Sequence, residues 1–416
     1  MLYYLLKYLM RLALPIYYKR LVLSGFENIP AKGPAILACN HPNAFLDAII
    51  MGTYSPRPLH FLTRSDVFNT PLKRWILARM NMVPIYRMRD GIENLEKNQE
   101  TFRKCREVLG NGGVILIFSE GLCIQELKLR PLKKGTARIA LDFASTNRSL
   151  AIVPVGLNYP HARQVRQRVF VGIAPAFDAL DFKKEFEEHA ARGIQSFNRT
   201  LEDALRTVVI DIESRQHESY FQQIMALLLK NRDFTLAELV ALGERFNHWV
   251  SQNNVTWTQT EQALTRYREM LAIHQVADEA VGAAHGGWFQ RALQLFFFLP
   301  GATLALVPFN AVRKFTAAKV RLPEFKDSVM VAAGMVLSFV TALVWILMAW
   351  TVQGRLALLI ALLIFFSCWV APPAFDRWKE LGASRQFARL PASARQALES
   401  ERAQLAELLH TNLLRG

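Results

Sequence analysis

Between Gly33 and Phe177, short apolar runs alternate with longer amphipathic segments, and this alternation limits the fold of the 416-residue chain more than any other feature. Short apolar runs predict buried strands, whereas apolar residues at three-and-four spacing predict helices. Strands are expected at 35–39, 59–63, 82–86, 114–118, 151–157 and 168–171. Helices are expected at 43–54, 70–79, 92–109 and 135–145. The pattern predicts an α/β domain with a mixed, mostly parallel sheet covered by helices.

The stretch NHPNAFLD, residues 40–47, follows the first of these strands and contains a histidine and a carboxylate six residues apart. A histidine accepts a proton near neutral pH, and a carboxylate can fix its tautomer and stabilise the resulting cation. On one continuous helix the two side chains would lie about 240° apart and could not meet. They can meet if His41 lies in a turn, which Pro42 favours, and Asp47 lies in the next helix. Asn43 would then cap that helix. His41 is therefore predicted to be a general base oriented by Asp47.

Charged residues follow other predicted strands. Arg64 and Arg87 come after two of them, and Glu120 comes after 114–118. A basic loop with Arg130 and Lys133 then precedes the helix at 135–145. Ligands bind beyond the carboxyl ends of parallel strands, and cations beside a helix N-terminus favour phosphate. A phosphate site is therefore predicted at this edge, although each arginine alone could be a solvated loop charge.

The composition narrows the class of partner. The net charge is +15 and 51% of the residues are hydrophobic, which together favour anionic lipid, phosphorylated substrates or nucleic acid. The cations are spread over strand ends and the flanks of apolar segments and are not interleaved with aromatic platforms, so no nucleic-acid partner is predicted. The four cysteines lack metal-ligand spacing, which predicts reduced thiols and no metal site.

Outside the α/β domain, expected at 25–180, the pattern predicts further segments. Residues 1–24 have leucines at helical spacing among lysines, arginines and tyrosines, which is typical of a helix in the membrane interface. A buried amphipathic helix is the alternative. Residues 181–286 are polar with helical periodicity and predict a helical domain without a recognisable motif.

The region 287–375 is predicted to be membrane-embedded. Residues 328–352 carry no charge over a length that can cross a bilayer, and 356–371 form a shorter apolar run. With basic residues on both flanks, these two segments predict a transmembrane hairpin with cytoplasmic ends. Residues 292–312 contain two prolines and a glycine, which favours a broken, re-entrant helix; three full spans are the alternative. Residues 376–416 predict a cytoplasmic helical tail.

Four short motifs together resemble a known family. NHPNAFLD, VPIYR, FSEG and IVPV match, in order and approximate spacing, the four motif blocks of the glycerolipid acyltransferase superfamily, the PlsC-like and lysophospholipid acyltransferases. The resemblance covers about 23–177. This family transfers a fatty acyl group from a thioester carrier to a glycerol hydroxyl, usually of glycerol phosphate or a lysophospholipid. The longer first block, with five residues between His41 and Asp47, resembles a subgroup that includes fungal glycerol-3-phosphate acyltransferases.

The resemblance implies roles for the residues at the sheet edge. His41 would take the proton of the acceptor hydroxyl, Arg64 and Arg87 would bind the acceptor phosphate, and Glu120 with Gly121 would shape the acceptor pocket. The acyl donor would be acyl-CoA or acyl carrier protein, with no bound cofactor. The expected protein is thus an integral membrane enzyme of phospholipid synthesis whose catalytic domain faces the cytoplasm and whose partners are membrane lipids and an acyl carrier.

The third block departs from the family pattern. Ser119 stands in place of the usual proline, Leu122 in place of threonine and Cys123 in place of arginine. The phosphate role of that arginine is expected to pass to Arg130 or Lys133. The altered block also leaves a second hypothesis, a lipid-binding or scaffold protein that has the acyltransferase fold without turnover.

Overall fold

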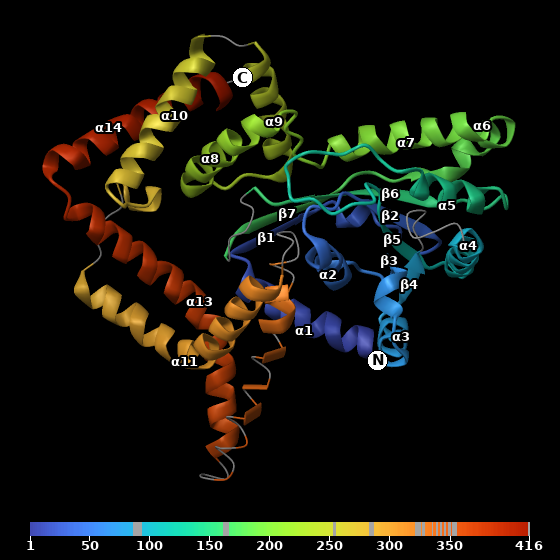
Figure 1. The fold of residues 1–416 in the computed structure, drawn as a ribbon, viewed down its shortest axis with the longest axis horizontal. Coiled ribbons are helices and arrows are strands. Elements are labelled where there is room, and N and C mark those ends of the chain that lie inside the picture. Colours follow the sequence, from blue (N-terminus) through green and yellow to red (C-terminus); the bar gives the residue numbers. More distant parts are fainter. Residues whose placement is uncertain are drawn as a thin grey trace. The chain divides into compact units, whose positions relative to one another are not determined.

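The computed structural model describes residues 1–85, 94–160, 166–252, 255–282, 287–320 and 356–414, with separate residues between 326 and 351. The chain forms two compact units. The first contains Met1–Asp211 and Thr235–Val240, and the second contains Ile212–Phe234 and Ala241–Gly416. The first unit holds the sheet, and the described part of the second is built from helices (Figure 1).

Among the described residues the sheet has eight strands, and its main path runs in the order β1-β7-β6-β2-β5-β3-β4, with β8 paired to β6. Their bounds are β1 (Arg20–Ser24), β2 (Ala35–Cys39), β3 (Leu59–Arg64), β4 (Met82–Ile85), β5 (Val114–Phe118), β6 (Ala151–Asn158), β7 (Arg168–Ile173) and β8 (Phe177–Asp178). Strands β6, β2, β5, β3 and β4 are parallel, whereas β7 and β8 run antiparallel to β6. The prediction of a mixed, mostly parallel sheet is confirmed.

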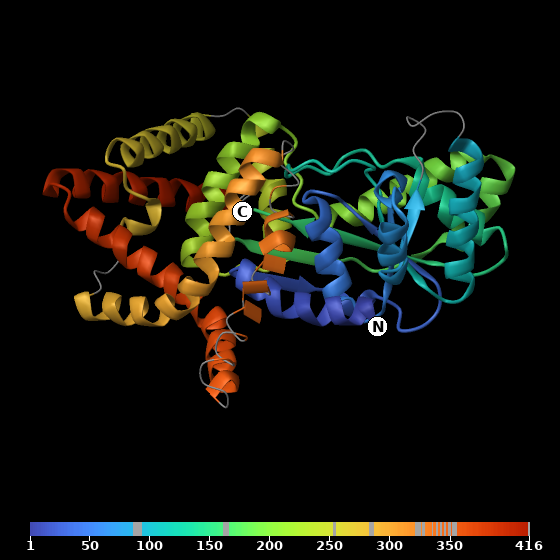
Figure 2. The ribbon, with the colours of Figure 1, turned by 60° about the horizontal axis from the view of Figure 1, so that its bottom comes forward.

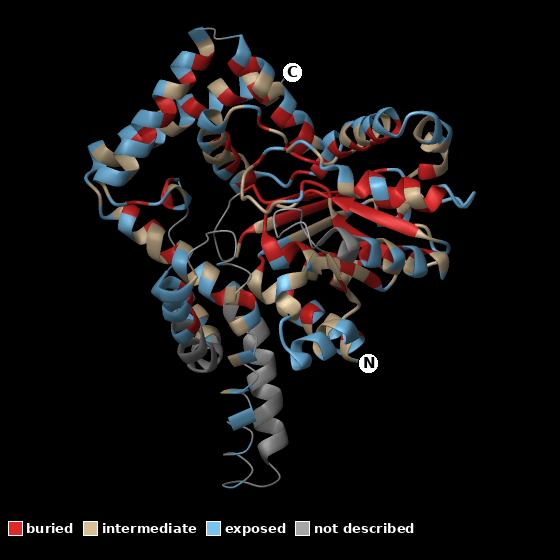
Figure 3. Cartoon of the chain, turned by 45° about the vertical axis from the view of Figure 1, so that its right-hand side comes forward, coloured by how far each residue is buried: buried red, intermediate tan, exposed pale blue. Residues whose placement is uncertain are grey.

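Helices cover both faces of the sheet (Figure 1). They are α1 (Leu2–Tyr17), α2 (Ala44–Tyr54), α3 (Pro71–Arg79), α4 (Asn94–Gly110), α5 (Lys134–Ala144), α6 (Lys183–Glu188) and α7 (Ala190–Arg206). Helices α4, α5 and α7 pack on the inner strands through a core that includes Cys105, Phe143 and Phe197, while α1 and α2 lie on the opposite face. All five residues of β2 are buried, and the inner strands form the buried centre of the unit (Figure 3). This packing fixes the edge at which β2 and β5 end.

The N-terminal segment differs from the expected helix over 1–24. The helix ends at Tyr17, and Tyr18 is extended with φ of −97° and ψ of 139°. Residues 20–24 form β1, which pairs in parallel with β7 at the end of the sheet path. Arg166 closes the junction by donating hydrogen bonds to the carbonyl oxygens of residues 15, 16 and 18. The apolar run Leu21–Leu23 therefore joins the sheet, because a strand partner far along the chain is available to it.

The second unit contains the remaining helices, with α9 beginning in the first. They are α8 (Arg215–Asn231), α9 (Leu236–Ser251), α10 (Val255–Ile273), α11 (Trp288–Lys319), α13 (Leu356–Ala388) and α14 (Ala392–Leu409). Short 3₁₀ and π turns occur at Phe26–Asn28, Ser65–Phe68, Ala179–Phe182, Asp278–Ala280 and His410–Leu414. Within this unit α11 packs beside α13 and α10 packs beside α14 (Figures 1 and 2). Residues 181–286, expected to form one helical domain, contain helices α6 to α10, but α6 and α7 belong to the first unit because α7 packs on β6 and α6 packs on α7.

The predicted membrane region is described in part. Eleven of the 25 residues in 328–352 lie outside the described residues. Residues 292–312, for which a broken helix is expected, lie within the uninterrupted helix α11, and 356–371 form only the first half of α13. Both helices continue past the expected ends because they pack along each other. Among the described residues, no helix has both the length and the apolarity that a membrane crossing requires.

Candidate active site

The carboxyl ends of β2 and β5 bring two of the predicted site residues to one edge of the sheet. Cys39 and Phe118, the last residues of these strands, are paired in register. His41 and Glu120 each follow two residues later. Since adjacent strands lie about 4.8 Å apart, the two loops that carry these side chains start next to each other. The expectation that His41 and Glu120 share one edge is confirmed.

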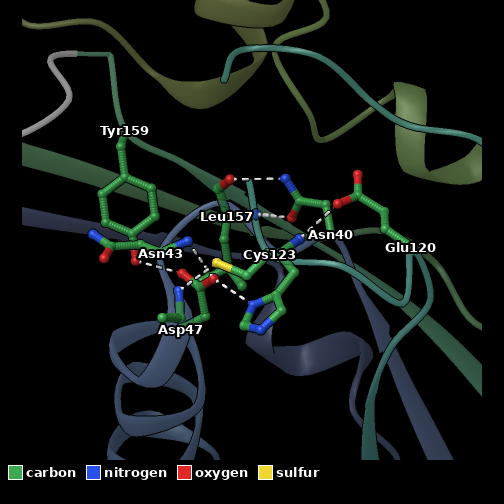
Figure 4. Close-up of polar contacts among 9 residues, drawn as sticks. Asn40, Asn43, Asp47, Glu120, Cys123, Leu157 and Tyr159 are labelled. Carbon is green, nitrogen blue, oxygen red and sulfur yellow. Dashed lines mark hydrogen bonds and ion pairs between the residues drawn. The ribbon is translucent and has the colours of Figure 1, made fainter. Parts of the chain in front are cut away.

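Hydrogen bonds hold the loop after β2 in place. The Asn40 side chain donates to the Leu157 carbonyl oxygen at 3.0 Å and accepts from the Leu157 amide at 2.8 Å, which ties the loop to β6 (Figure 4). Helix α2 begins at Ala44 with Asn43 at its N-cap position. The Asn43 side chain makes no capping bond, contrary to expectation. Instead, the Asn43 amide donates to Asp47 Oδ2 at 2.7 Å, so the carboxylate closes the first turn.

His41 and Asp47 are in direct contact. His41 Nδ1 lies 2.9 Å from Asp47 Oδ2, and the Asp47 side chain is fully buried, whereas 17% of the His41 side chain is exposed. A carboxylate can only accept, so in neutral His41 the proton sits on Nδ1 and Nε2 keeps its lone pair. The imidazole stacks on the Phe118 ring at 3.6 Å between centroids. No described residue binds Nε2, so this nitrogen is available to a substrate proton.

Glu120 supports the site through the backbone. One of its carboxylate oxygens accepts from the His41 amide at 3.1 Å, and the other accepts from the Arg130 amide at 3.1 Å. The side chain is 4% exposed, and this burial raises the pKa of Glu120 above its ordinary value. Glu120 therefore joins the loop after β2 to the basic loop, in addition to any contact with an acceptor.

Gly121 and Lys133 lie against each other on the same edge. Gly121 has φ of +69°, and a Cβ at this position would lie 3.0 Å from Lys133 Cγ. The Lys133 amide donates to the Ser119 carbonyl oxygen at 2.8 Å, and Lys133 occupies the N-cap position of α5. The aliphatic part of Lys133 thus lies beside Gly121, and Lys133, an exposed residue, stands at the positive end of the α5 helix dipole.

The predicted arginines differ in their availability. Arg64 ends β3 and forms an ion pair with Asp66, and both side chains are more than half exposed. Arg130 forms an ion pair with Glu126 at 2.5 Å, and its side chain is 22% exposed. Arg87 lies outside the described residues. Among the described residues, no group of three or more His, Cys, Asp or Glu side chains is placed to hold a metal ion.

Two residues at the site have no role in the predictions from sequence. Tyr159, which directly follows β6, donates to Asp47 Oδ1 at 2.7 Å (Figure 4). Cys123 Sγ accepts from the Ala44 amide at 2.9 Å, at the start of α2. Ala44 has φ of 36°, a conformation that costs about 1–3 kcal/mol in a residue other than glycine, and the thiol helps to hold it there. The position of Tyr159 directly after a strand is the signal that could have identified it.

Comparisons with known proteins find relatives for the region that contains this site. Residues 20–158 match a family model described as Acyltransferase. A chloroplastic 1-acyl-sn-glycerol-3-phosphate acyltransferase of Arabidopsis thaliana is 28% identical over 136 residues, 32% of this chain and 35% of that protein. One of Brassica napus is 27% identical over 32% of this chain and 36% of its own length. The chain thus matches about a third of the length of these relatives.

A solved structure is also similar in part. The 1-acyl-sn-glycerophosphate acyltransferase PlsC from Thermotoga maritima has a TM-score of 0.34 and 20% identity, covering 47% of this chain and 80% of that one. The family match begins at β1 and ends at β6, so it contains the loops that carry His41, Asp47 and Glu120. Residues 20–158 are thus similar to the Acyltransferase family, and the curated relatives that match part of this chain are 1-acyl-sn-glycerol-3-phosphate acyltransferases.

Proposed function

We propose that this protein transfers a fatty acyl group from an acyl thioester, acyl-CoA or acyl carrier protein, to a hydroxyl of 1-acylglycerol-3-phosphate or glycerol-3-phosphate. The observation that carries the proposal is the His41–Asp47 contact, because it leaves Nε2 as a base at the edge of the sheet. The relatives named above are 1-acyl-sn-glycerol-3-phosphate acyltransferases, which favours the acylated acceptor.

The reaction requires one proton acceptor and no protein nucleophile. His41 Nε2 removes the proton of the acceptor hydroxyl as its oxygen attacks the thioester carbonyl carbon. Asp47 stabilises the imidazolium that forms, since its buried carboxylate accepts from Nδ1. The tetrahedral intermediate then collapses, the carbon–sulfur bond breaks, and the thiolate leaves as a thiol after taking the proton from His41. The products are an ester and a free thiol.

Lys133 is the best-placed cation for the acceptor phosphate. It is exposed, and its backbone is fixed by Ser119 at the start of α5. Arg64 and Arg130 each already pair with a carboxylate, which must be given up or shared when a phosphate binds. A lysine beside a helix N-terminus offers charge and backbone donors to the same anion.

Lys133→Ala is expected to raise the KM for the phosphorylated acceptor about tenfold with a smaller change in kcat, because a charge-assisted contact contributes about 1.5–3 kcal/mol. The measurement is steady-state kinetics with the acceptor varied at saturating acyl thioester. Lys32→Ala is the matched control, since Lys32 is an exposed lysine before β2, at the opposite edge of the sheet. An unchanged acceptor KM in Lys133→Ala would remove Lys133 from the phosphate site.

The wild-type protein tests the proposal directly. Purified protein in detergent is mixed with acyl-CoA or acyl carrier protein, and thiol release is followed with and without each acceptor. Acceptor-dependent thiol release, with the matching ester found by lipid analysis, is the expected result, and the favoured acceptor and donor are read from the panel. Lipid binding with no acceptor-dependent release would instead identify the scaffold protein without turnover.

A membrane location is part of the proposal. On α1, several large apolar side chains are exposed, beside Lys7 and Arg11 in the same helix: Tyr4, Leu5, Tyr8 and Leu12. Such a face fits the interface of a bilayer, and the uncharged run 328–352 fits its interior. The lipid acceptor would then reach the sheet edge from the membrane, and the thioester carriers favour a cytoplasmic orientation. Flotation of the full chain with anionic vesicles tests this part.

A further inference from the structure

Asp47 accepts three hydrogen bonds, two from the loop after β2 and one from the residue after β6. His41 Nδ1 and the Asn43 amide both bind Oδ2, at 2.9 and 2.7 Å. The Tyr159 hydroxyl binds Oδ1 at 2.7 Å. Oδ2 is thus shared between the loop and the histidine, while the described contact of Oδ1 is with the tyrosine (Figure 4). Two fixed oxygens define the plane of the carboxylate, and with it the direction in which His41 is held.

We infer that Tyr159 is a positioning residue of the acyl-transfer reaction, which acts on His41 through Asp47. The inference rests on the proposed function. Tyr159 directly follows β6, whose pairing with β2 places it beside the loop that carries His41. The tyrosine is 3% exposed and lies 112 residues from Asp47 in the sequence, so the contact is made by the fold.

The hydroxyl of Tyr159 is suited to be a permanent donor. Burial, followed by the charge of Asp47, raises the pKa of Tyr159 well above its ordinary value, so the proton stays on the phenol. A neutral donor stabilises the carboxylate without competing for its charge. The hydroxyl therefore stays protonated and holds Oδ1 without neutralising the charge of Asp47.

Removal of the Tyr159 hydroxyl is expected to affect His41, the proposed general base, in two ways. The carboxylate loses the contact that fixes Oδ1, so His41 is held less well and proton transfer slows. The carboxylate also loses a neutral donor, so its negative charge interacts more strongly with the imidazolium. Other titratable groups face this cluster and remain in place in the variant: Tyr18, Cys39, Glu120 and Cys123.

The test is Tyr159→Phe, which keeps the buried ring and removes the hydroxyl. We expect kcat to fall about ten- to a hundredfold, with the KM values for thioester and acceptor within about twofold of wild type, because Tyr159 is buried and its hydroxyl binds Asp47. We also expect the acidic limb of the kcat/KM profile to move to higher pH. A loss of rate from loosened packing alone would lower the whole profile without moving this limb.

Tyr3→Phe is the matched control. The Tyr3 hydroxyl is also buried and makes two bonds, donating to the Gly52 carbonyl oxygen and accepting from the Leu59 amide. Its removal is expected to lower stability while the pH profile stays that of wild type. Thermal unfolding of both variants shows whether each is folded.

The outcomes separate the two proposals. If wild type catalyses no acyl transfer, the proposed function fails. If wild type is active and folded Tyr159→Phe has the kcat and pH profile of wild type, the positioning role is overturned. A loss of rate that equals the loss in Tyr3→Phe, with no displaced limb, also overturns it.

Discussion

His41→Ala is expected to lower kcat by about 10²- to 10⁴-fold, because the acceptor hydroxyl loses the base that removes its proton. The substrates still bind, since the predicted phosphate and pocket residues lie on other loops, so KM changes little. The measurement is acceptor-dependent thiol release at saturating substrate. Imidazole added to the assay should restore part of the rate, because a small base can enter the space left by the side chain.

His60→Ala is the matched control for this variant. His60 lies in β3, is half-buried, and its Nδ1 contacts the Val114 carbonyl oxygen at 3.3 Å, a structural contact in the same sheet. Its loss is expected to leave kcat within about twofold of wild type and to lower stability slightly. Folded His41→Ala protein with wild-type turnover would end the proposal of a histidine base.

The second large effect concerns Asp47. Asp47→Asn keeps the size of the side chain, and its amide oxygen can still accept from His41, but the charge that stabilises the imidazolium is gone. By comparison with the carboxylate of serine-protease triads, kcat should fall about 10³- to 10⁴-fold. Comparing the steady-state kcat of this variant with that of His41→Ala shows how much of the rate supplied by the His41 base depends on Asp47.

Asp47→Ala should also destabilise the fold. It leaves the His41 ring nitrogen, the Asn43 amide and the Tyr159 hydroxyl without their acceptor, and each unsatisfied buried donor costs about 1–3 kcal/mol. Partial relaxation gives an expected loss of about 2–5 kcal/mol in the free energy of unfolding. Urea unfolding measures it. Asp142→Ala, which breaks the exposed ion pair with Arg106, should lower the free energy of unfolding by less than about 1 kcal/mol. If both variants lost the same free energy, the hydrogen bonds of Asp47 would contribute no more than an exposed ion pair.

Much of the α/β domain could be predicted from local patterns. Strands β2 and β5 begin and end where the apolar runs do, because both are central strands buried on both faces. The His41–Asp47 contact could also be predicted from local sequence, because Pro42 favours a turn after β2 that lets the two side chains meet. The edge that His41 and Glu120 share follows from the rule for parallel strands.

The rest depends on contacts between distant parts of the chain. β1 was not predicted, because its run of three apolar residues forms a strand only when it pairs with β7. The same residues would fit the end of a helix equally well. The partners of Asp47 and Asn40 lie 112 and 117 residues away. The ion pairs of Arg64 and Arg130 depend on side-chain conformation, which cannot be predicted from the spacing of residues in the sequence. The roles assigned to the site residues remain predictions for the experiments above.

The pairing of β1 with β7 cannot form until most of the α/β domain has been synthesised. Residues 20–24 leave the ribosome well before their partner at 168–173, and at about 5–20 residues per second the interval is about 7–30 s. Through that interval α1, with its exposed leucines and tyrosines, precedes a strand that has no place to dock. Residues 2–17 therefore offer an apolar surface to chaperones or to a bilayer long before the sheet edge that carries His41 is assembled.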